Sequence, residues 1–232
     1  MRIAELKNFG VALSDMSLAI PKEQSRAIEA AGKKIIQQRL GFFKMLRFLL
    51  LCAVRTRKMS RQDLSDALPP EMNNQGFIAS QIEFAAMYAA LATIAGPDQA
   101  VEILDEIMAQ VAEIAYPAIF PSPADFNRCD DPWEAWKAYF VAMAQADQKA
   151  GAHVYHVVEN TDQAFQMNCS FCAWYAIPQA LGVGRACLPS CHADDIYFPQ
   201  ACAEIGVAFK RSQTLARGGE CCDFRFERLG AA

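Results

Sequence analysis

The sequence predicts an α+β fold in which a helical N-terminal half packs on a small antiparallel sheet, with the sheet region in the element order ββααββ. Apolar residues recur every three or four positions up to about residue 150, the period of helices, and every second position in segments beyond residue 151, the period of strands. Turn-forming residues separate the strands in pairs, as hairpins require. We therefore expect a helical region over residues 1–150, integral to the fold, and an α+β, cysteine-rich catalytic region over residues 151–232.

Four long helices are expected in the first region. Residues 24–54 carry one apolar stripe and are predicted as a single helix, whereas residues 77–95 are apolar almost all round and are predicted as a central helix. A third helix opens after Gly96, and a proline-rich segment ends it. The fourth begins with Asp131 as its cap, followed by Pro at the first helical position, and ends near Gly151.

The second region is predicted as two hairpins with two helices between them. In chain order, the expected elements are strands 153–159 and 164–169, helices 171–181 and 192–205, and strands 207–215 and 222–228. The first pair of strands is joined by a polar turn and the second pair by a loop with two glycines. Antiparallel pairing of the four strands follows from these connections.

The composition is that of a globular protein. Of 232 residues, 53% are hydrophobic and 21% are charged, which argues against a disordered or a membrane-spanning chain. The apolar run 40–54 is interrupted by Lys44 and Arg47 and falls short of the ~20 residues that a bilayer span needs. No apolar segment typical of a signal peptide follows the first Arg. We expect a cytoplasmic protein with no membrane partner and with reduced cysteines.

Charge is segregated along the first half of the chain. Residues 22–61 hold eleven Lys or Arg and two Glu, whereas residues 62–127 hold ten Asp or Glu and no Lys or Arg. A basic run can mark a nucleic-acid interface, but the aromatic and glycine-rich context of such an interface is missing. We expect no nucleic-acid partner. We expect instead helices whose complementary faces touch within or between subunits, in a chain compatible with a homo-oligomer.

Seven of the nine cysteines fall in one 54-residue stretch, at positions 169, 172, 187, 191, 202, 221 and 222. Strand alternation places Cys169 and Cys222 on an inner face. Cys191 stands where a loop is expected to become a helix, and the unpaired N–H groups of a helix start favour a thiolate. His192 adds a neighbouring positive charge, and Asp194 can carry a proton. This stretch predicts cysteine chemistry.

Two other interpretations compete with catalysis. Cys169-x-x-Cys172 and Cys187-x-x-x-Cys191 have spacings typical of zinc ligands, with His192 adjacent, so a cysteine-ligated zinc or small-molecule binding module, such as a sensor, is the alternative. Against zinc, Cys172 is expected on the helix after the strand, pointing elsewhere than Cys169. We predict no metal ligands and no cofactor, with zinc the one metal left open. The third interpretation is a helical interaction protein with buried cysteines.

The residues of this stretch form an ordered set. It comprises Cys169 closing a strand, Leu181-Gly182 ending a helix, Cys191-x-x-Asp194 with Tyr197, Gly218-Gly219, and the strand Cys222-Asp223-Phe224-Arg225-Phe226. The set resembles the L-2-amino-thiazoline-4-carboxylic acid hydrolase family over about residues 164–228. Four cysteines are extra to the family pattern and leave the exact substrate open: Cys172, Cys187, Cys202 and Cys221.

The resemblance implies a hydrolase that opens or desulfurises a small N,S-heterocycle, of the 2-aminothiazoline-carboxylate or thiohydantoin type. The carbon bonded to nitrogen and sulfur is an electrophile that suits a soft thiolate. Attack gives a tetrahedral centre, sulfur leaves, and water releases the product. A desulfhydrase-type reaction follows from the same logic when the sulfur lies outside the ring. The expected partner is a small-molecule substrate.

The same resemblance suggests roles for individual residues. Cys191 is the expected nucleophile and Asp194 the proton shuttle, while Cys169 and Cys222 line the pocket and are alternative nucleophiles. Expected substrate-binding residues are His192, Asn168, Arg217 and Trp174. Arg217 is drawn from four arginines near enough in sequence to hold a substrate carboxylate: Arg185, Arg211, Arg217 and Arg225. His153 and His156 are interpreted as structural histidines on opposite sides of one strand.

Overall fold

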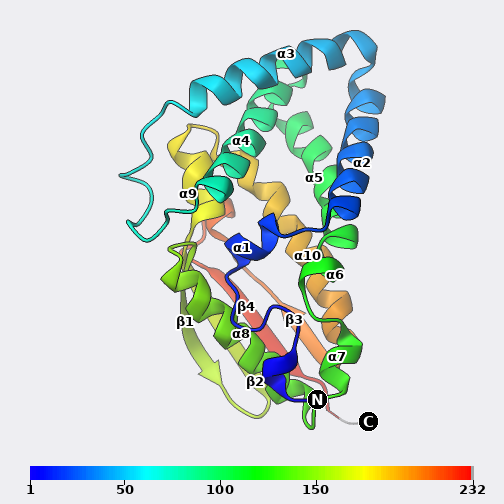
Figure 1. Cartoon of the computed structure of the whole chain (residues 1–232), viewed down its shortest axis with the longest axis vertical. Helices are drawn as coiled ribbons and strands as arrows, with labels where there is room; N and C mark the ends of the chain where they lie inside the picture. The colour runs from blue at the N-terminus through cyan, green and yellow to red at the C-terminus, as the bar shows by residue number, and fades with distance from the viewer. Residues whose placement is uncertain (231–232) are drawn as a thin grey trace.

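A four-stranded antiparallel sheet forms one end of the molecule, with the strand order β1-β2-β4-β3 (Figure 1). The strands are β1 (His153–Asn160), β2 (Ala164–Cys172), β3 (Val207–Lys210) and β4 (Cys222–Arg228). The computed structural model describes residues 1–230 and confirms the predicted α+β class. In chain order the sheet region reads β1, β2, α9, η2, α10, β3, η3, β4, so short 3₁₀ helices interrupt the predicted simple order.

The remaining elements are helical. The α-helices are α1 (Leu13–Leu18), α2 (Lys22–Leu40), α3 (Phe42–Met59), α4 (Gln75–Ala95), α5 (Pro97–Ile114), α6 (Tyr116–Ile119), α7 (Pro123–Asn127), α8 (Pro132–Lys149), α9 (Ala173–Ala180) and α10 (Cys187–Ala203). The 3₁₀ helices are η1 (Ile3–Glu5) before α1, η2 (Gly184–Ala186) between α9 and α10, and η3 (Leu215–Arg217) between β3 and β4. Helices α2 to α5 form a helical end away from the sheet, and α10 runs from that end to the sheet (Figure 1).

Helix α8 joins the helical region to the sheet. As predicted, Asp131 caps it by accepting hydrogen bonds from the N–H groups of Trp133 and Glu134, and Pro132 occupies the first helical position. The predicted aromatic stripe is core, because Trp136 and Phe140 pack on Phe226 of β4 with ring centroids 5.5 and 5.1 Å away. The same core takes in residues of α10, so α8 and α10 cover one face of the sheet.

The predicted single helix over residues 24–54 is wrong. The chain forms two helices instead, α2 and α3, which meet at Gly41 with a φ of +74°. A glycine adopts this conformation without the steric cost that a Cβ atom brings, so it ends one helix and lets the next start at an angle. Arg39 of α2 then pairs with Glu102 and Glu106 of α5 at 2.7 and 3.5 Å, which joins the basic and acidic segments within one chain.

Three boundaries in the second region also differ from prediction. Strand β2 continues to Cys172, because residues 171 and 172 pair with residues 154 and 153 of β1. Strand β3 ends at Lys210 rather than near residue 215, because the Asp223 carboxylate accepts the N–H groups of Ser212 and Gln213 in place of strand partners. Helix α10 begins at Cys187 rather than near His192, since a proline is tolerated in the first turn of a helix.

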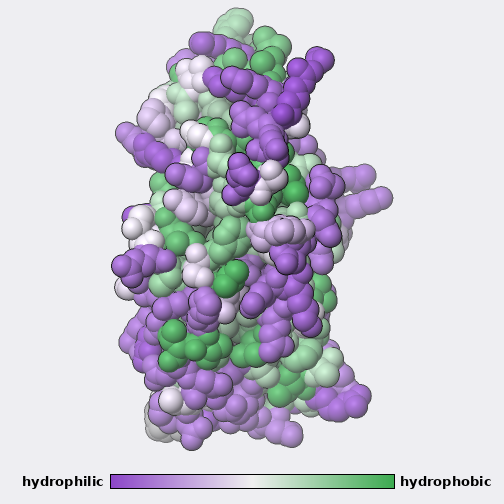
Figure 2. Space-filling view, turned by 90° about the vertical axis from the view of Figure 1, so that its left-hand side faces the viewer, coloured by the Kyte–Doolittle hydropathy of each residue, from purple (hydrophilic) through white to green (hydrophobic). Residues whose placement is uncertain are grey.

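Helix α4 is the one helix among residues 1–230 with the length and apolar composition of a membrane span. It contributes nine buried residues to the interior, as expected of a central helix in a folded core. Helix α3 differs, because it leaves a row of large apolar side chains exposed: Phe42, Phe43, Leu46, Leu49, Leu50 and Val54. Figure 2 shows hydrophobic surface among hydrophilic side chains at this end of the molecule.

We predict that Gly151→Ala destabilises the fold more than Gly182→Ala. Both glycines have a φ near +70°, but a Cβ on Gly151 would lie 2.6 Å from the backbone nitrogen of Met72, whereas Gly182 has open space. The left-handed conformation alone costs about 1–2 kcal/mol, and the backbone clash adds to it at residue 151 only. Urea unfolding of both variants measures the difference, and equal free energies of unfolding would contradict it.

Candidate functional site

A cavity of about 170 Å³ lies between the sheet, α8 and α10, and is closed by residues of α1, α5 and α6. An apolar cavity of roughly 150 Å³ accommodates a benzene ring, so this one has the size of a single small ring. Its lining is mainly apolar and aromatic. Five of the nine cysteines also line it: Cys169, Cys172, Cys187, Cys191 and Cys222.

The cavity brings together most of the residues predicted from sequence. Cys169, Cys191, Asp194, Cys222 and Trp174 all line it. Cys169 and Cys222 lie directly opposite each other on β2 and β4, and both are buried, as strand alternation predicts. Their roles in chemistry stay predictions.

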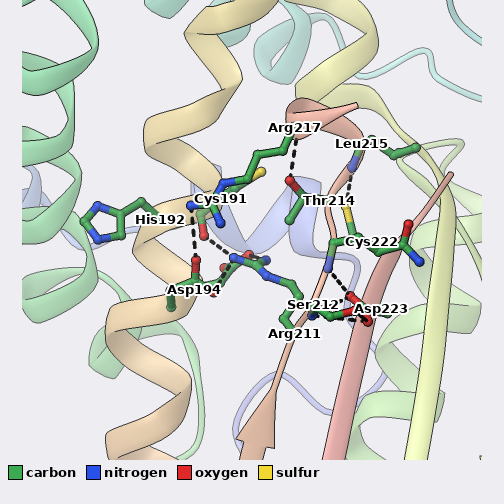
Figure 3. Close-up of polar contacts among 12 residues, drawn as sticks. Cys191, His192, Asp194, Arg211, Ser212, Thr214, Leu215, Arg217, Cys222 and Asp223 are labelled. Atoms are coloured by element: carbon green, nitrogen blue, oxygen red, sulfur yellow. Dashed lines mark hydrogen bonds and ion pairs between the residues drawn. The ribbon is translucent and has the colours of Figure 1, made fainter. Parts of the chain in front are cut away.

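Three predicted substrate-binding residues are not among the lining residues. Asn168 alternates with Cys169 along β2 and accepts a hydrogen bond from Gln166 on the other face of the sheet. His192 points away from its neighbour Cys191 toward α5, where its Nδ1 lies 3.3 Å from Asp105 (Figure 3). The remaining one, Arg217, has a side chain that is 60% exposed. Adjacent residues on a helix or strand face different directions, and this separates these side chains from the cavity.

Cys191 lies in the second turn of α10, not at the helix start that the sequence indicated. Its Sγ is 3.9 Å from the Sγ of Cys187, one turn earlier. The hydrogen bond from Cys187 lowers the pKa of Cys191, helped by the charge of Arg211 and opposed by burial and Asp194. The same hydrogen bond and burial raise the pKa of Cys187, so Cys191 is the more acidic thiol of the pair.

Arg211 organises the polar end of the cavity (Figure 3). Its side chain is 2% exposed, and its two terminal nitrogens contact Asp194 at 3.0 Å and Asp195 at 2.6 Å. It also donates to the carbonyl of Cys191 at 2.5 Å. Asp194 accepts a further hydrogen bond from the hydroxyl of Tyr116 at 3.0 Å. Burial raises the pKa of Asp194 despite these donors, so the carboxyl group can hold a proton more readily than an exposed one.

A second polar cluster, from α8, β1 and β2, also reaches the cavity and was missed in the sequence. The Asp147 carboxylate is fully buried, accepts the N–H of Leu13 at 2.6 Å, and lies 2.9 Å from Nδ1 of His153. The His153 ring stacks on Trp174, with centroids 4.8 Å apart and planes 11° apart. His153 is directly opposite Cys172 in the pairing of β1 with β2, and both side chains line the cavity.

The charge state of His153 follows from this setting. Burial lowers the pKa of the imidazole, but the negative charges of Cys172 and Asp147 outweigh burial and raise it to about 10. The expectation that Cys172 points elsewhere than Cys169 is wrong, because Cys172 ends β2 and lines the same cavity. A prediction of β2 that was three residues longer would have placed Cys172 opposite His153 in the hairpin and so revealed this cluster.

Residues 77–226 match the model of a protein family described as L-2-amino-thiazoline-4-carboxylic acid hydrolase. The chain belongs to this family. The matched segment contains both polar clusters of the cavity, and it places the chain among hydrolases of a small heterocycle. Among the described residues, no group of three or more His, Cys, Asp or Glu side chains is arranged to hold a metal ion.

Two other comparisons add little to the family assignment. No curated protein matches the chain. A crystal structure of a mutant Fe(II) unliganded H-NOX protein from K. algicida is similar with a TM-score of 0.38 and 11% identity, covering 88% of this chain and 95% of that chain. A likeness at this level carries no argument about function.

We predict that Arg211→Met lowers the free energy of unfolding by about 3–5 kcal/mol, because it leaves Asp194 and Asp195 without their buried partner. Arg217→Met is the matched control, since its side chain is mainly in solvent and its loss is expected to stay within about 0.5 kcal/mol. Urea unfolding at pH 7 measures both. Equal effects would contradict the central place of Arg211.

We predict that His153 carries a proton on both ring nitrogens at pH 8. The unfolded histidine has a pKa of about 6.5, and the folded value is about 10. The stabilisation from the charged ring is therefore complete below pH ~6.5 and is lost as the pH rises through about 10. Nitrogen-15 NMR of the imidazole, assigned with His153→Gln, reports the protonation state. A neutral ring at pH 8 would exclude the charged pair.

Proposed function

We propose that this chain hydrolyses a small N,S-heterocycle of the 2-aminothiazoline-carboxylate or thiohydantoin type, through attack of a cysteine thiolate on the carbon bonded to nitrogen and sulfur. The observation that carries this proposal is the convergence of five cysteines on one ring-sized cavity. Family membership supports the hydrolase class and the heterocycle. The setting we propose is the cytoplasm, where the nine free cysteines stay reduced.

The residues around the cavity supply what such a reaction needs. The carbon between nitrogen and sulfur is a soft electrophile, and a thiolate is the soft nucleophile among protein side chains. Attack forms a carbon–sulfur bond to the enzyme, and the substrate's own carbon–sulfur bond then breaks. Water adds to the resulting adduct and releases the enzyme thiolate. An aminothiazoline gives a carbamoyl product with a free thiol, whereas a thiohydantoin gives a carbonyl and sulfide.

Charge in the cavity suits this substrate class. Arg211 is shared between Asp194 and Asp195, so carboxylate oxygens remain near Cys191 that can accept the N–H groups of an amidine-like ring. The raised pKa of Asp194 suits a group that exchanges a proton with substrate. Cys191, the nucleophile that the sequence predicts, has a lowered pKa, and Cys172 lines the same cavity as a second candidate for the attacking thiolate.

The alternative of a zinc-ligated sensor is tested by metal content. Elemental analysis of the purified chain reports stoichiometric zinc if the thiols coordinate a metal. We expect substoichiometric zinc, and activity that persists after dialysis against a chelator. Loss of activity with the metal would favour the alternative.

We predict that the chain releases free thiol from 2-aminothiazoline-4-carboxylate, or sulfide from a thiohydantoin, in a panel of such rings. In water enriched in oxygen-18, one heavy oxygen should appear in the new carbonyl group of the product. Acid quenching during turnover should trap an enzyme adduct, visible by intact mass as the substrate fragment bound to one cysteine. An oxygen analogue of the ring is the matched control. Turnover without any adduct, after full alkylation of the cysteines, would contradict thiolate attack.

A further inference from the structure

We propose that Cys172, His153 and Asp147 form a nucleophile–base–orienter triad, and that Cys172 is the thiolate that attacks the substrate. This inference rests on the proposed function and assigns its chemistry to named residues. The sequence alone favours attack by Cys191 and a structural role for His153. The geometry of the cavity favours Cys172 instead.

The order of contacts is that of an activated nucleophile. The buried Asp147 carboxylate lies 2.9 Å from Nδ1 of His153, so the other ring nitrogen stays available to Cys172, which stands directly opposite His153 in the pairing of β1 with β2. Trp174 stacks on the imidazole, which fixes the plane of the ring. The N–H of Leu13 holds the second carboxylate oxygen of Asp147 at 2.6 Å, so the orienting group is itself oriented. A thiol, an imidazole and a carboxylate in this order recur in unrelated cysteine hydrolases.

The other cavity thiols lack such a base. Burial raises the pKa of Cys169, which donates to the carbonyl of Phe171 at 3.0 Å. Burial also raises the pKa of Cys222, to about 12. Cys191 has a lowered pKa, but its adjacent histidine, His192, points toward α5 and away from the cavity.

Cys172 is also within reach of a substrate. It is half-buried, and it lines both the ring-sized cavity and a neighbouring surface pocket with Ala67, Tyr175 and Gln179. The thiol therefore stands between the cavity and the surface. A small molecule that occupies the cavity can reach Cys172 with His153 and also Arg211, because all of these side chains line it.

The triad accounts for every proton in the reaction. The Cys172 thiolate forms a bond to the ring carbon, and the imidazolium of His153 gives its proton to the departing sulfur as the substrate's carbon–sulfur bond breaks. Neutral His153 then takes a proton from water, whose oxygen bonds to the same carbon. The carbon–Cys172 bond breaks, the thiolate returns, and His153 is again an imidazolium. For an aminothiazoline, the net change is the addition of one water to the substrate. For a thiohydantoin, the oxygen of water replaces the sulfur, which leaves as sulfide.

The test compares single variants in the full chain. Cys172→Ser should lower kcat at least about 1,000-fold, whereas Cys191→Ser should lower it less than about 10-fold and Cys52→Ser, outside the cavity, should leave it unchanged. Asp147→Asn, which changes a positioning residue, should lower kcat and shift the pH profile of kcat/KM. Loss of activity in Cys191→Ser with activity retained in Cys172→Ser would overturn the assignment.

A second arm needs no substrate and separates this inference from the proposed function. Wild-type protein is treated with iodoacetamide at pH 6.5, and peptide mass spectrometry follows each cysteine. Cys172 should react at least about ten times faster than Cys52, because a thiolate is the reactive form, and His153→Gln should remove this advantage. Equal rates for Cys172 and Cys52 would overturn the triad even if a heterocycle is hydrolysed. Fast alkylation at Cys172 without turnover of any ring in the panel would contradict the substrate class and leave the triad supported.

Discussion

The buried carboxylate of Asp147 is the contact on which the rest of the cavity depends. It belongs to α8, yet it accepts hydrogen bonds from the backbone of Leu13 at the start of α1 and from His153 at the start of β1. A buried charge without partners is costly, so these three segments are held in one arrangement. Because α1 closes the cavity and β1 aligns β2, the position of Cys172 follows from the same carboxylate.

Two charged clusters line an apolar cavity, and each is compensated locally. Arg211 pairs with two aspartates in one cluster, while in the other the imidazole of His153 contacts a carboxylate and stands opposite Cys172. Interactions of this kind are stronger in a cavity lined by aromatic and aliphatic side chains than in water. Groups arranged before substrate binds also need no reorganisation during reaction, which is the main source of electrostatic catalysis.

Periodicity predicted the α+β class, the cap at Asp131 and the inward faces of Cys169 and Cys222, because each of these depends on local spacing. The break at Gly41 was missed, because a single glycine can also occur within a helix. Its positive φ, which ends the helix, is not visible in the sequence. The pairing of Cys172 with His153 depends on where β2 ends, which cross-strand hydrogen bonds decide. Arg211 was left among four arginines, because its burial arises from contacts with α10 and not from the local pattern around residue 211.

The extra cysteines of this chain acquire a physical meaning from their positions. Cys172 and Cys187 are extra to the family pattern that the sequence resembles, yet both line the cavity, each beside a titratable side chain: His153 opposite Cys172, and Cys191 one turn after Cys187. Cys202, by contrast, is core, and burial raises its pKa. The reactivity of a thiol depends on its neighbours. The position of Cys172 opposite His153 therefore says more about function than the number of cysteines does.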